Sequence, residues 1–239
     1  MQSPLSIARA ARAFVRLVRD PANLDEVFVL ADAMESSMAI EQIRAEFATD
    51  PAHVRALEER PRLGKLDLDA LSALPAGTLG HEFAANMRRL GLDPDDIVVN
   101  DVRTDFDFVR AHLRETHDVW HTVTGFGTDV AGELGLQAFY LGQFRAPLSA
   151  LLLMVGFANT LFFSMDDKDA RMREIARGWL LGRRARTFFG VRWADMWAEP
   201  LGDVRRRMSV DVDVLDRFLD EFVAGLPLSV ARPTARAAA

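Results

Sequence analysis

Hydrophobic residues along the chain recur at intervals of three and four positions, which is the period of an amphipathic α-helix. No stretch shows the alternation of apolar and polar residues that is typical of a half-buried strand. The periodic segments predict helices over 5–19, 24–40, 41–48, 51–59, 67–74, 79–90, 105–124 and 146–165, and over a segment that begins near 129. We therefore predict an all-α fold in a single domain over residues 1–239, with a frayed tail at 229–239.

Capping residues set several of these helix boundaries. Thr78 can accept a hydrogen bond from the first turn of the helix 79–90, and Gly91 can end this helix in the left-handed conformation. The helix that starts near Asp105 is stopped by the segment Gly125–Gly127. We interpret this segment as a corner between two helices.

The N-terminal helix, within residues 1–20, separates basic from apolar residues. One face carries Arg9, Arg12, Arg16 and Arg19, and the other carries Ile7, Phe14, Leu17 and Val18. Such a helix can dock on the domain, lie on an anionic membrane or serve as a mitochondrial presequence. Docking on the domain is the simplest interpretation.

The segment 146–165 contains no charged residue, and at about 20 residues it is long enough to span a bilayer. Polar residues and a proline interrupt it, however, and no second segment of this kind is present. We therefore predict a buried helix, which in a lipid-binding protein would line an apolar ligand tunnel. The arginines that follow, from Arg171 to Arg192, are expected to form a solvated face or to contact phospholipid headgroups.

The overall composition excludes several classes of chemistry. The chain has 239 residues, no cysteine and a formal net charge of −6. Without cysteine, neither a disulfide nor a thiolate metal site can form, so any metal must be bound by nitrogen and oxygen. The charge balance argues against a nucleic-acid binder, which normally carries a strong basic excess. No flavin, nicotinamide or nucleotide motif is present.

One helix carries residues that are suited to binding a divalent metal. His117 and His121 are four residues apart, so both rings lie on the same helix face. Asp118 lies beside them, and Glu133 can return to the pair if the corner folds the next helix back. Burying two carboxylates beside two histidines is costly unless a cation compensates their charge. Zinc is the leading candidate, with iron(II) or manganese as alternatives.

Other interpretations of these residues stay open. The two histidines could be core residues that are bonded to backbone carbonyl groups. A zinc protease would have glutamate at position 118, where this chain has the shorter Asp118. A phosphohydrolase of the HD type would need a second, distant pair, for which the candidates are His53, His81, Asp166 and Asp167. His112 lies off the ligand face and is expected to be exposed or to act as a surface partner.

The spacing of the four candidate ligands resembles a known metal motif. His117-Asp118-x-x-His121, followed by eleven residues and Glu133, is similar to the metal motif of the Coq-four family of ubiquinone (coenzyme Q) biosynthesis. The resemblance extends over about residues 60–210. The other segments that carry the resemblance are Leu74–Gly80, Arg114–Asp118, Thr124–Asp129 and a C-terminal segment that contains Trp193, Trp197, Leu201 and Arg205.

The resemblance implies an all-helical protein that holds a metal, usually zinc, on these four residues. It implies a prenylated ligand in an apolar tunnel, and we hypothesise that the prenyl chain lies along 146–165 with the aromatic ring at the metal. The implied activity is removal of the ring carboxyl group from a prenylated hydroxybenzoate, which is the reaction of a decarboxylating lyase. The family is also described as an organiser of the other biosynthetic enzymes.

The implied partners are a prenylated aromatic quinone precursor, other ubiquinone biosynthesis enzymes, a membrane surface and, as an option, a second copy of the chain in a homodimer. The implied location is peripheral, on the cytoplasmic side of the inner membrane in a bacterium or the matrix side of the mitochondrial inner membrane in a eukaryote. Two alternatives remain. One is a non-catalytic scaffold or prenyl-lipid-binding protein, whose metal only pins the corner at Gly125–Gly127. The other is a metal-dependent phosphohydrolase.

Overall fold

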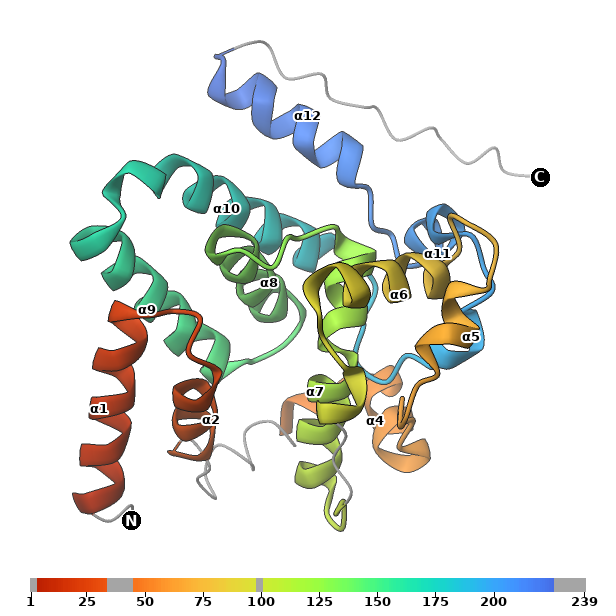
Figure 1. The fold of residues 1–239 in the computed structure, drawn as a ribbon, viewed down its shortest axis with the longest axis horizontal. Helices are drawn as coiled ribbons and strands as arrows, with labels where there is room; N and C mark the ends of the chain where they lie inside the picture. The colour runs from red at the N-terminus through yellow and green to blue at the C-terminus, as the bar shows by residue number, and fades with distance from the viewer. Residues whose placement is uncertain (1–3, 34–44, 98–100, 226–239) are drawn as a thin grey trace.

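The computed structural model describes residues 4–33, 45–97 and 101–225 of the chain (Figure 1). Helices dominate, and this part of the chain contains no strand beyond an isolated bridge between Thr78 and Pro200. The α-helices are α1 (Pro4–Arg19), α2 (Leu24–Ala33), α4 (Pro51–Glu59), α5 (Leu68–Ser72), α6 (Leu79–Leu90), α7 (Asp105–Thr124), α8 (Val130–Gln143), α9 (Pro147–Phe163), α10 (Lys168–Arg184), α11 (Leu201–Arg207) and α12 (Val212–Val223). Short 3₁₀ helices are η1 (Pro94–Ile97), η2 (Met165–Asp167) and η3 (Trp193–Met196). The prediction of an all-α fold is confirmed for the described residues.

Helix α6 begins and ends where its capping residues predicted. Thr78 accepts a hydrogen bond from the amide of His81, and Gly91 ends the helix with a φ of 66°. Residues 34–40 of the predicted helix 24–40, residues 41–44 of the predicted helix 41–48 and the tail 229–239 lie outside the described residues, whereas residues 45–47 are helical.

Helix α7 runs through the middle of the molecule, with α6 and α11 on one side and α8 and α10 on the other (Figure 1). Every residue from Val119 to Thr124 is buried. The ring of Trp120 packs against Phe139 of α8 and against Phe188, with centroids 5.8 and 5.2 Å away. Burying a large apolar side chain stabilises a fold by about 1.5–3 kcal/mol. The position of α7 is therefore fixed by the core.

Helices α8 and α10 approach each other closely through glycines. A Cβ atom on Gly178 of α10 would lie 1.9 Å from the carbonyl oxygen of Gly135 on α8. A Cβ atom on Gly182 would lie 2.5 Å from the carbonyl oxygen of Phe139. These contacts fix the position of α8, whose first turn carries Glu133.

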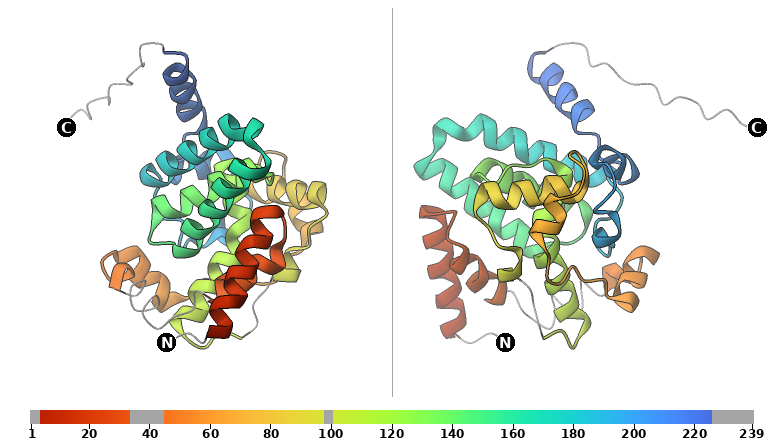
Figure 2. Two further views of the ribbon diagram at one scale, coloured as in Figure 1. Left: turned by 90° about the vertical axis from the view of Figure 1, so that its left-hand side faces the viewer. Right: turned by 45° about the vertical axis from the view of Figure 1, so that its right-hand side comes forward.

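Helix α9 is the predicted apolar helix, and it is buried on one side only. It packs on α1 and α8, and Asn159 within it donates to the carbonyl oxygen of Val18 at 2.8 Å (Figure 2). Its other side leaves a row of apolar residues exposed, namely Met154, Phe157 and Leu161. The prediction of a buried helix is therefore correct for one face. None of the described helices combines the length and the apolar character that crossing a bilayer requires.

Helix α1 docks on the domain, as the simplest interpretation predicted. Ala13 and Leu17 are buried in a small cluster with Leu30 of α2 and Val155 of α9. All four arginines of its basic face are exposed. Ile7 was expected on the buried face but is 56% exposed, because the packing against α2 and α9 is concentrated in the later turns.

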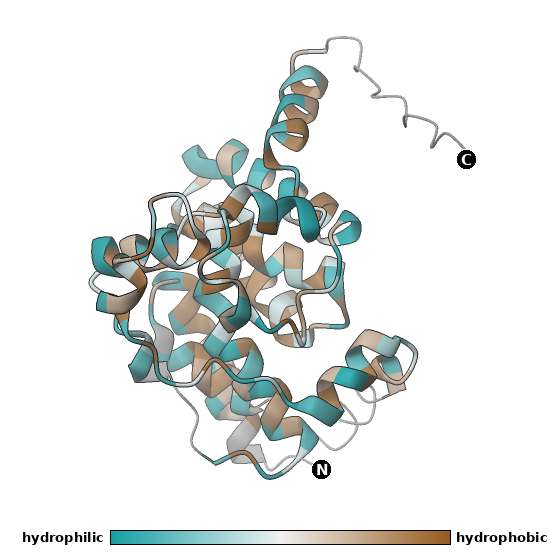
Figure 3. Cartoon of the chain, turned by 90° about the vertical axis from the view of Figure 1, so that its right-hand side faces the viewer, coloured by the Kyte–Doolittle hydropathy of each residue, from teal (hydrophilic) through white to brown (hydrophobic). Residues whose placement is uncertain are grey.

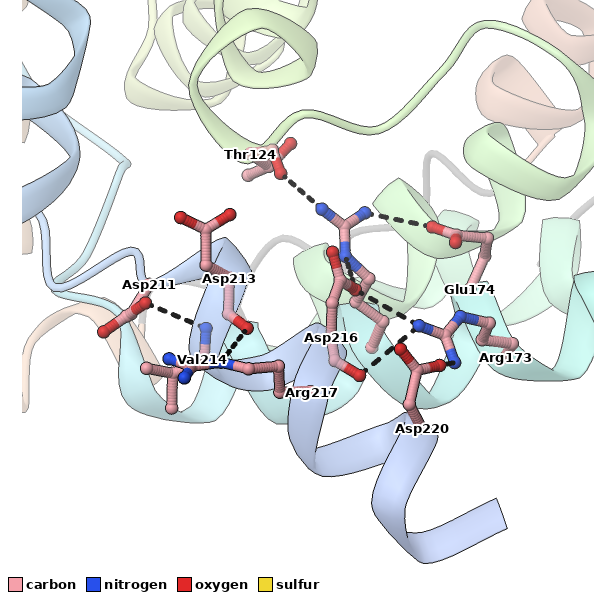
Figure 4. A network of polar contacts seen from close by, with 10 residues as sticks. Thr124, Arg173, Glu174, Asp211, Asp213, Val214, Asp216, Arg217 and Asp220 are labelled. Atoms are coloured by element: carbon pink, nitrogen blue, oxygen red, sulfur yellow. Dashed lines mark hydrogen bonds and ion pairs between the residues drawn. The ribbon is translucent and has the colours of Figure 1, made fainter. Parts of the chain in front are cut away.

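Two arginines of α10, Arg171 and Arg177, were predicted to lie on a solvated face but are buried. Arg171 donates to the side-chain oxygen of Asn159 at 2.7 Å. Arg177 forms an ion pair with Asp216 at 3.1 Å and donates to the carbonyl oxygen of Thr124 at 3.1 Å (Figure 4). The prediction of an entirely solvated face is wrong because α9, α12 and the end of α7 supply partners for these cations.

Helix α12 projects from the body and is tied to α10 by charged residues (Figure 3). Arg173 forms ion pairs with Asp216 at 3.6 Å and with Asp220 at 2.7 Å. The apolar side of α12 stays partly open, with Phe218, Phe222 and Val223 exposed. The polar side of α12 forms these ion pairs, while Leu215 and Leu219 on its inner side are buried in the main hydrophobic core.

His112 is buried, which corrects the expectation that it is exposed. Only 1% of the residue is exposed, because the segment around Pro61 and the segment around Gly190 cover this side of α7. Its Nδ1 donates to the carbonyl oxygen of Pro61 at 2.9 Å, and its Nε2 accepts from the amide of Gly190 at 3.0 Å. Burial lowers the pKa of this imidazole to about 4.

This buried histidine predicts an acid-sensitive fold. The unfolded chain takes up a proton near pH 6.5, whereas folded His112 stays neutral down to about pH 4. Its contribution to the free energy of unfolding is therefore complete above pH 6.5 and decreases by about 3 kcal/mol as the pH falls to 4. Denaturant unfolding of metal-free protein between pH 7 and 4 should show this decrease. In the His112→Gln variant the curve should be flatter, and parallel curves for the two proteins would contradict the prediction.

Candidate metal centre

The end of α7 and the start of α8 bring the four predicted ligands together. Helix α7 ends at Gly125, whose φ of 74° lies in the left-handed region that turns the chain out of the helix. Asp129 then caps α8 by accepting a hydrogen bond from the amide of Gly132 at 2.8 Å. The predicted corner between two helices is present, and it places Glu133 in the first turn of α8 opposite the histidines.

His117 and His121 face each other across one turn of α7. Their Nε2 atoms are 3.2 Å apart. The Nδ1 of His121 lies 3.1 Å from the carbonyl oxygen of Phe126, which can only accept, so Nδ1 carries the proton and Nε2 of the neutral ring presents a lone pair. Two nitrogens bound to a tetrahedral zinc ion lie about 3.3 Å apart. The observed spacing therefore suits one shared ion.

The two carboxylates approach this pair of histidines from different helices. His117, Asp118 and His121 each offer a ligand atom, and these atoms lie within 4.8 Å of one another. The Oε1 of Glu133 lies 3.2 Å from Nε2 of His121, and its Oε2 lies 3.7 Å from Nε2 of His117. The group of His117, Asp118 and His121 could hold a metal ion, whereas metal binding itself and the part of Glu133 in it stay predictions.

The centre lies at the edge of a cavity of about 260 Å³. The side chain of His121 is 6% exposed, whereas those of His117 and Glu133 are 31% and 40% exposed. Asp118 and His121 form part of the cavity wall, together with residues of α6, the corner and α11. No residue of α9 belongs to this wall, so a tunnel along α9 also stays a prediction.

A family model described as "Coenzyme Q (ubiquinone) biosynthesis protein Coq4" matches residues 3–213. The chain belongs to the Coq4 family. The match begins well before residue 60, where the motifs alone placed the start of the resemblance. Helix α1 is thus part of what this protein shares with the Coq4 family.

Similar proteins agree with this assignment. The mitochondrial ubiquinone biosynthesis protein coq4 of Aspergillus niger is 30% identical over 213 residues, which are 85% of this chain and 71% of that protein. The mitochondrial COQ4 homologue of Danio rerio is 29% identical over 209 residues, or 82% and 73% of the two chains. A crystal structure of a Nostoc punctiforme protein assigned to ubiquinone biosynthesis has a TM-score of 0.74 at 30% identity, and covers 85% of this chain and 98% of its own.

Two residues outside the ligand motif shape the centre of this Coq4-family protein. A Cβ atom on Gly132 would lie 2.1 Å from the carbonyl oxygen of Gly127, so glycine lets the first turn of α8 pack on the corner. Tyr140 Oη lies 3.3 Å from Nδ1 of His117, and its ring stacks on Trp120 at 4.4 Å. Neither residue was predicted from the sequence. Tyr140 lies seven positions after Glu133, which puts the two on the same face of α8 and could have indicated it.

Contacts among the side chains of the centre shift the pKa values of Glu133, His117 and Tyr140. Burial opposes the charge on Glu133, but the imidazoles of His117 and His121 outweigh it and lower the pKa of Glu133 to about 2. Burial also opposes protonation of His117, yet Glu133 and then Asp118 raise the pKa of its imidazole. Burial, with Asp118 and Glu133, raises the pKa of Tyr140, which keeps its phenol neutral. A metal ion that enters this group therefore competes with a proton on His117.

The residues considered for an HD-type phosphohydrolase lie elsewhere. His81 is bonded to backbone carbonyl oxygens, and Nε2 of His53 lies 2.8 Å from the hydroxyl of Thr187. Over the described ranges, the group with metal-binding spacing includes neither histidine, nor Asp166 or Asp167. The geometry thus gives the phosphohydrolase interpretation no second pair.

The contact between Tyr140 and His117 predicts a defined loss of metal affinity. With a metal on Nε2 of His117, the protonated Nδ1 donates to the Tyr140 oxygen and orients the ring. Tyr140→Phe removes this acceptor while the ring still packs on Trp120. Loss of such an outer partner typically lowers metal affinity by about 10–100-fold. Competition with a chromophoric chelator should show this decrease at an unchanged melting temperature, and an unchanged zinc affinity would contradict the prediction.

Proposed function

We propose that this protein removes the ring carboxyl group from a prenylated hydroxybenzoate precursor of ubiquinone, using a divalent metal on His117, Asp118, His121 and Glu133. The observation that carries the proposal is the half-open group of histidines and carboxylates beside a cavity, in a chain of the Coq4 family. The relatives described as ubiquinone biosynthesis proteins support the pathway. The reaction is that of a decarboxylating lyase.

The donor set fits a cation of intermediate hardness. Imidazole nitrogens and carboxylate oxygens suit zinc, iron(II) and manganese, and zinc is our leading candidate. Tyr140 and the carbonyl group of Phe126 contact the Nδ1 atoms of the two histidines, which leaves both Nε2 atoms free for an ion. Proteins orient metal-binding histidines in this way.

The residues around the centre would hold the aromatic ring and position its oxygens. A divalent cation bound there would stabilise negative charge on substrate oxygens while the bond between the ring and the carboxyl group breaks, carbon dioxide leaves and the ring carbon takes up a proton in its place. The cavity beside Asp118 and His121 gives the ring a place next to the centre. Glu133, whose side chain is 40% exposed, would be able to move aside and open a position for a substrate oxygen.

We assign the prenyl chain and the membrane to the apolar outer side of α9. Its exposed row of Met154, Phe157 and Leu161 continues at the end of the helix with Phe162 and Phe163. Contiguous exposed apolar residues mark contacts with lipids or with other proteins. They support a peripheral position on a membrane, and we propose the cytoplasmic side in a bacterium or the matrix side in a mitochondrion. They also support contact with other ubiquinone biosynthesis enzymes or with a second copy of the chain.

The same surface favours a second candidate function. A scaffold or prenyl-lipid carrier would use the exposed apolar residues of α9 and α12 for its partners, and its metal would only hold the corner. The two functions differ in whether the metal ligands are required for chemistry.

The deciding experiment compares quinone precursors by mass spectrometry in cells that lack their own protein. These cells receive either the intact chain or its His121→Ala variant. We expect the intact chain to restore quinone, and the variant to accumulate a prenylated precursor that keeps its ring carboxyl group. Equal restoration by both proteins would remove the metal from the function and favour the scaffold. Turnover of prenylated hydroxybenzoate by purified protein, with and without a chelator, then separates direct catalysis from assembly.

A further inference from the structure

Arg205 of α11 lies in the wall of the cavity that also contains Asp118 and His121. Its guanidinium group contacts the carbonyl groups at the end of α7. Its Nε donates to the carbonyl oxygen of Val123 at 2.8 Å, and its Nη2 donates to the carbonyl oxygen of Thr122 at 3.2 Å. A cation at this place satisfies the last carbonyl groups of α7. Capping, however, uses only two of the five N–H donors of the guanidinium group.

Arg205 differs from its neighbours in lacking a carboxylate partner. Arg206 and Arg207 on the same helix form ion pairs with Asp203 and Glu199. In the part of the chain that the structure describes, no carboxylate lies within ion-pair distance of Arg205, and Asp213 and Glu82 act on its charge only from farther away. Burial and the nearby cation of Arg177 lower the pKa of its guanidinium group. A half-buried cation in this position would gain from an anion that enters the cavity.

The rest of the cavity wall supports an anionic aromatic ligand. Glu82 is already engaged, because it accepts a hydrogen bond from the amide of Gly77 at 3.0 Å. A second cation, Arg89, donates to Asn86, and both belong to the wall. Apolar surface comes from Met87, Leu90, Phe126 and Leu201. The wall thus combines apolar residues with two arginines and with the carboxylates of Glu82 and Asp118.

We propose that this cavity binds the carboxylate of an aromatic acid, and that Arg205 donates hydrogen bonds to that carboxylate. The inference rests on the proposed function and deepens it, because it names the residue that recognises the group to be removed. Charge-assisted hydrogen bonds are roughly twice as strong as neutral ones, and a planar guanidinium group can bind both carboxylate oxygens. Arg205 would thereby select ring-carboxylated substrates over rings that lack this group.

The test measures how the protein discriminates between an acid and its neutral analogue. Purified full-length protein, with zinc and without added metal, is titrated calorimetrically with 4-hydroxybenzoate and with 4-hydroxybenzamide. We expect the intact protein to prefer the acid in both states. Arg205→Gln should weaken binding of the acid by about tenfold or more and leave the amide nearly unchanged. The matched control Arg206→Gln, on the exposed side of the same helix, should bind both as the intact protein does.

Several outcomes would overturn the proposal. They are the absence of any preference for the acid in the intact protein, an equal loss of acid and amide in Arg205→Gln, or the same loss in Arg206→Gln. Should Arg205→Gln fail to fold, Arg205→Lys keeps the charge without the planar fork. It is then expected to retain a weaker preference for the acid, and an unchanged preference in this variant would count against bidentate recognition.

The two proposals can fail separately. If Arg205 determines acid binding but complemented cells keep the carboxylated precursor, the decarboxylation is wrong and the anion site stands. If the chain restores quinone but acid binding ignores Arg205, the proposed function stands and Arg205 serves only to cap α7.

Discussion

The His117→Ala variant is expected to lose its zinc and to keep its helical fold. His117 contributes one of the two imidazole nitrogens that lie 3.2 Å apart, so the variant is left with only three of the four proposed metal ligands. Loss of an outer partner of a ligand lowers metal affinity by about 10–100-fold, and loss of a ligand itself should cost more. Elemental analysis after dialysis against a weak chelator should find zinc in the intact protein and only background in the variant.

The fold is expected to survive because other contacts hold the corner. Gly125 ends α7 in the left-handed conformation, and the side chain of Asp129 caps α8 by accepting from the amide of Gly132. Phe126 at the corner is 4% exposed, and the guanidinium group of Arg177 lies 4.5 Å from the centre of its ring. The side chain of His117, by contrast, is 31% exposed and contributes little to the core. Circular dichroism should therefore show the same helix content in both proteins.

A second histidine variant provides the control for this prediction. His81 also lies on a helix but bonds only to backbone carbonyl oxygens away from the centre. His81→Ala should keep its zinc. If His117→Ala alone lost its helical signal, the metal would be structural, and the scaffold interpretation would gain over catalysis.

The local parts of this structure could be predicted from the sequence. Caps act within one turn, so Thr78, Gly91 and Gly125 were sufficient to place the ends of their helices. The ligand face was predictable for a similar reason, because the helical period converts the spacing of His117 and His121 into a shared direction. To place Glu133 near these histidines, it was then necessary to assume only that the chain turns back at Gly125–Gly127.

The remaining features depend on segments that are distant in the sequence. His112 is buried because Pro61 and Gly190 cover its side of α7, and nothing near position 112 indicates either contact. Arg177 is buried for the same reason, since Asp216 comes from another helix. Periodicity shows which residues share a face, but it does not show which faces other segments cover.

The close contact between Gly178 of α10 and Gly135 of α8 predicts that a larger residue at position 178 destabilises the fold. Gly178→Ala places a Cβ atom 1.9 Å from the carbonyl oxygen of Gly135, and neither backbone can yield without separating α8 from α10. Overpacking of this kind costs about 3 kcal/mol or more. For a chain of this size the melting temperature should fall by roughly 6–12 °C. Zinc affinity should fall as well, because the displaced α8 carries Glu133.

The same substitution at Gly202 is the matched control for Gly178→Ala. A Cβ atom there meets no atom within 4 Å, and the residue lies in the first turn of α11. Alanine in a helix is favoured over glycine by roughly 0.5–1 kcal/mol, so Gly202→Ala should melt at the same temperature or slightly higher. Both variants add one methyl group to a helical glycine, and only the contact with Gly135 distinguishes them. If the two melted alike, the close packing of α8 on α10 would not be what fixes Glu133 opposite the histidines.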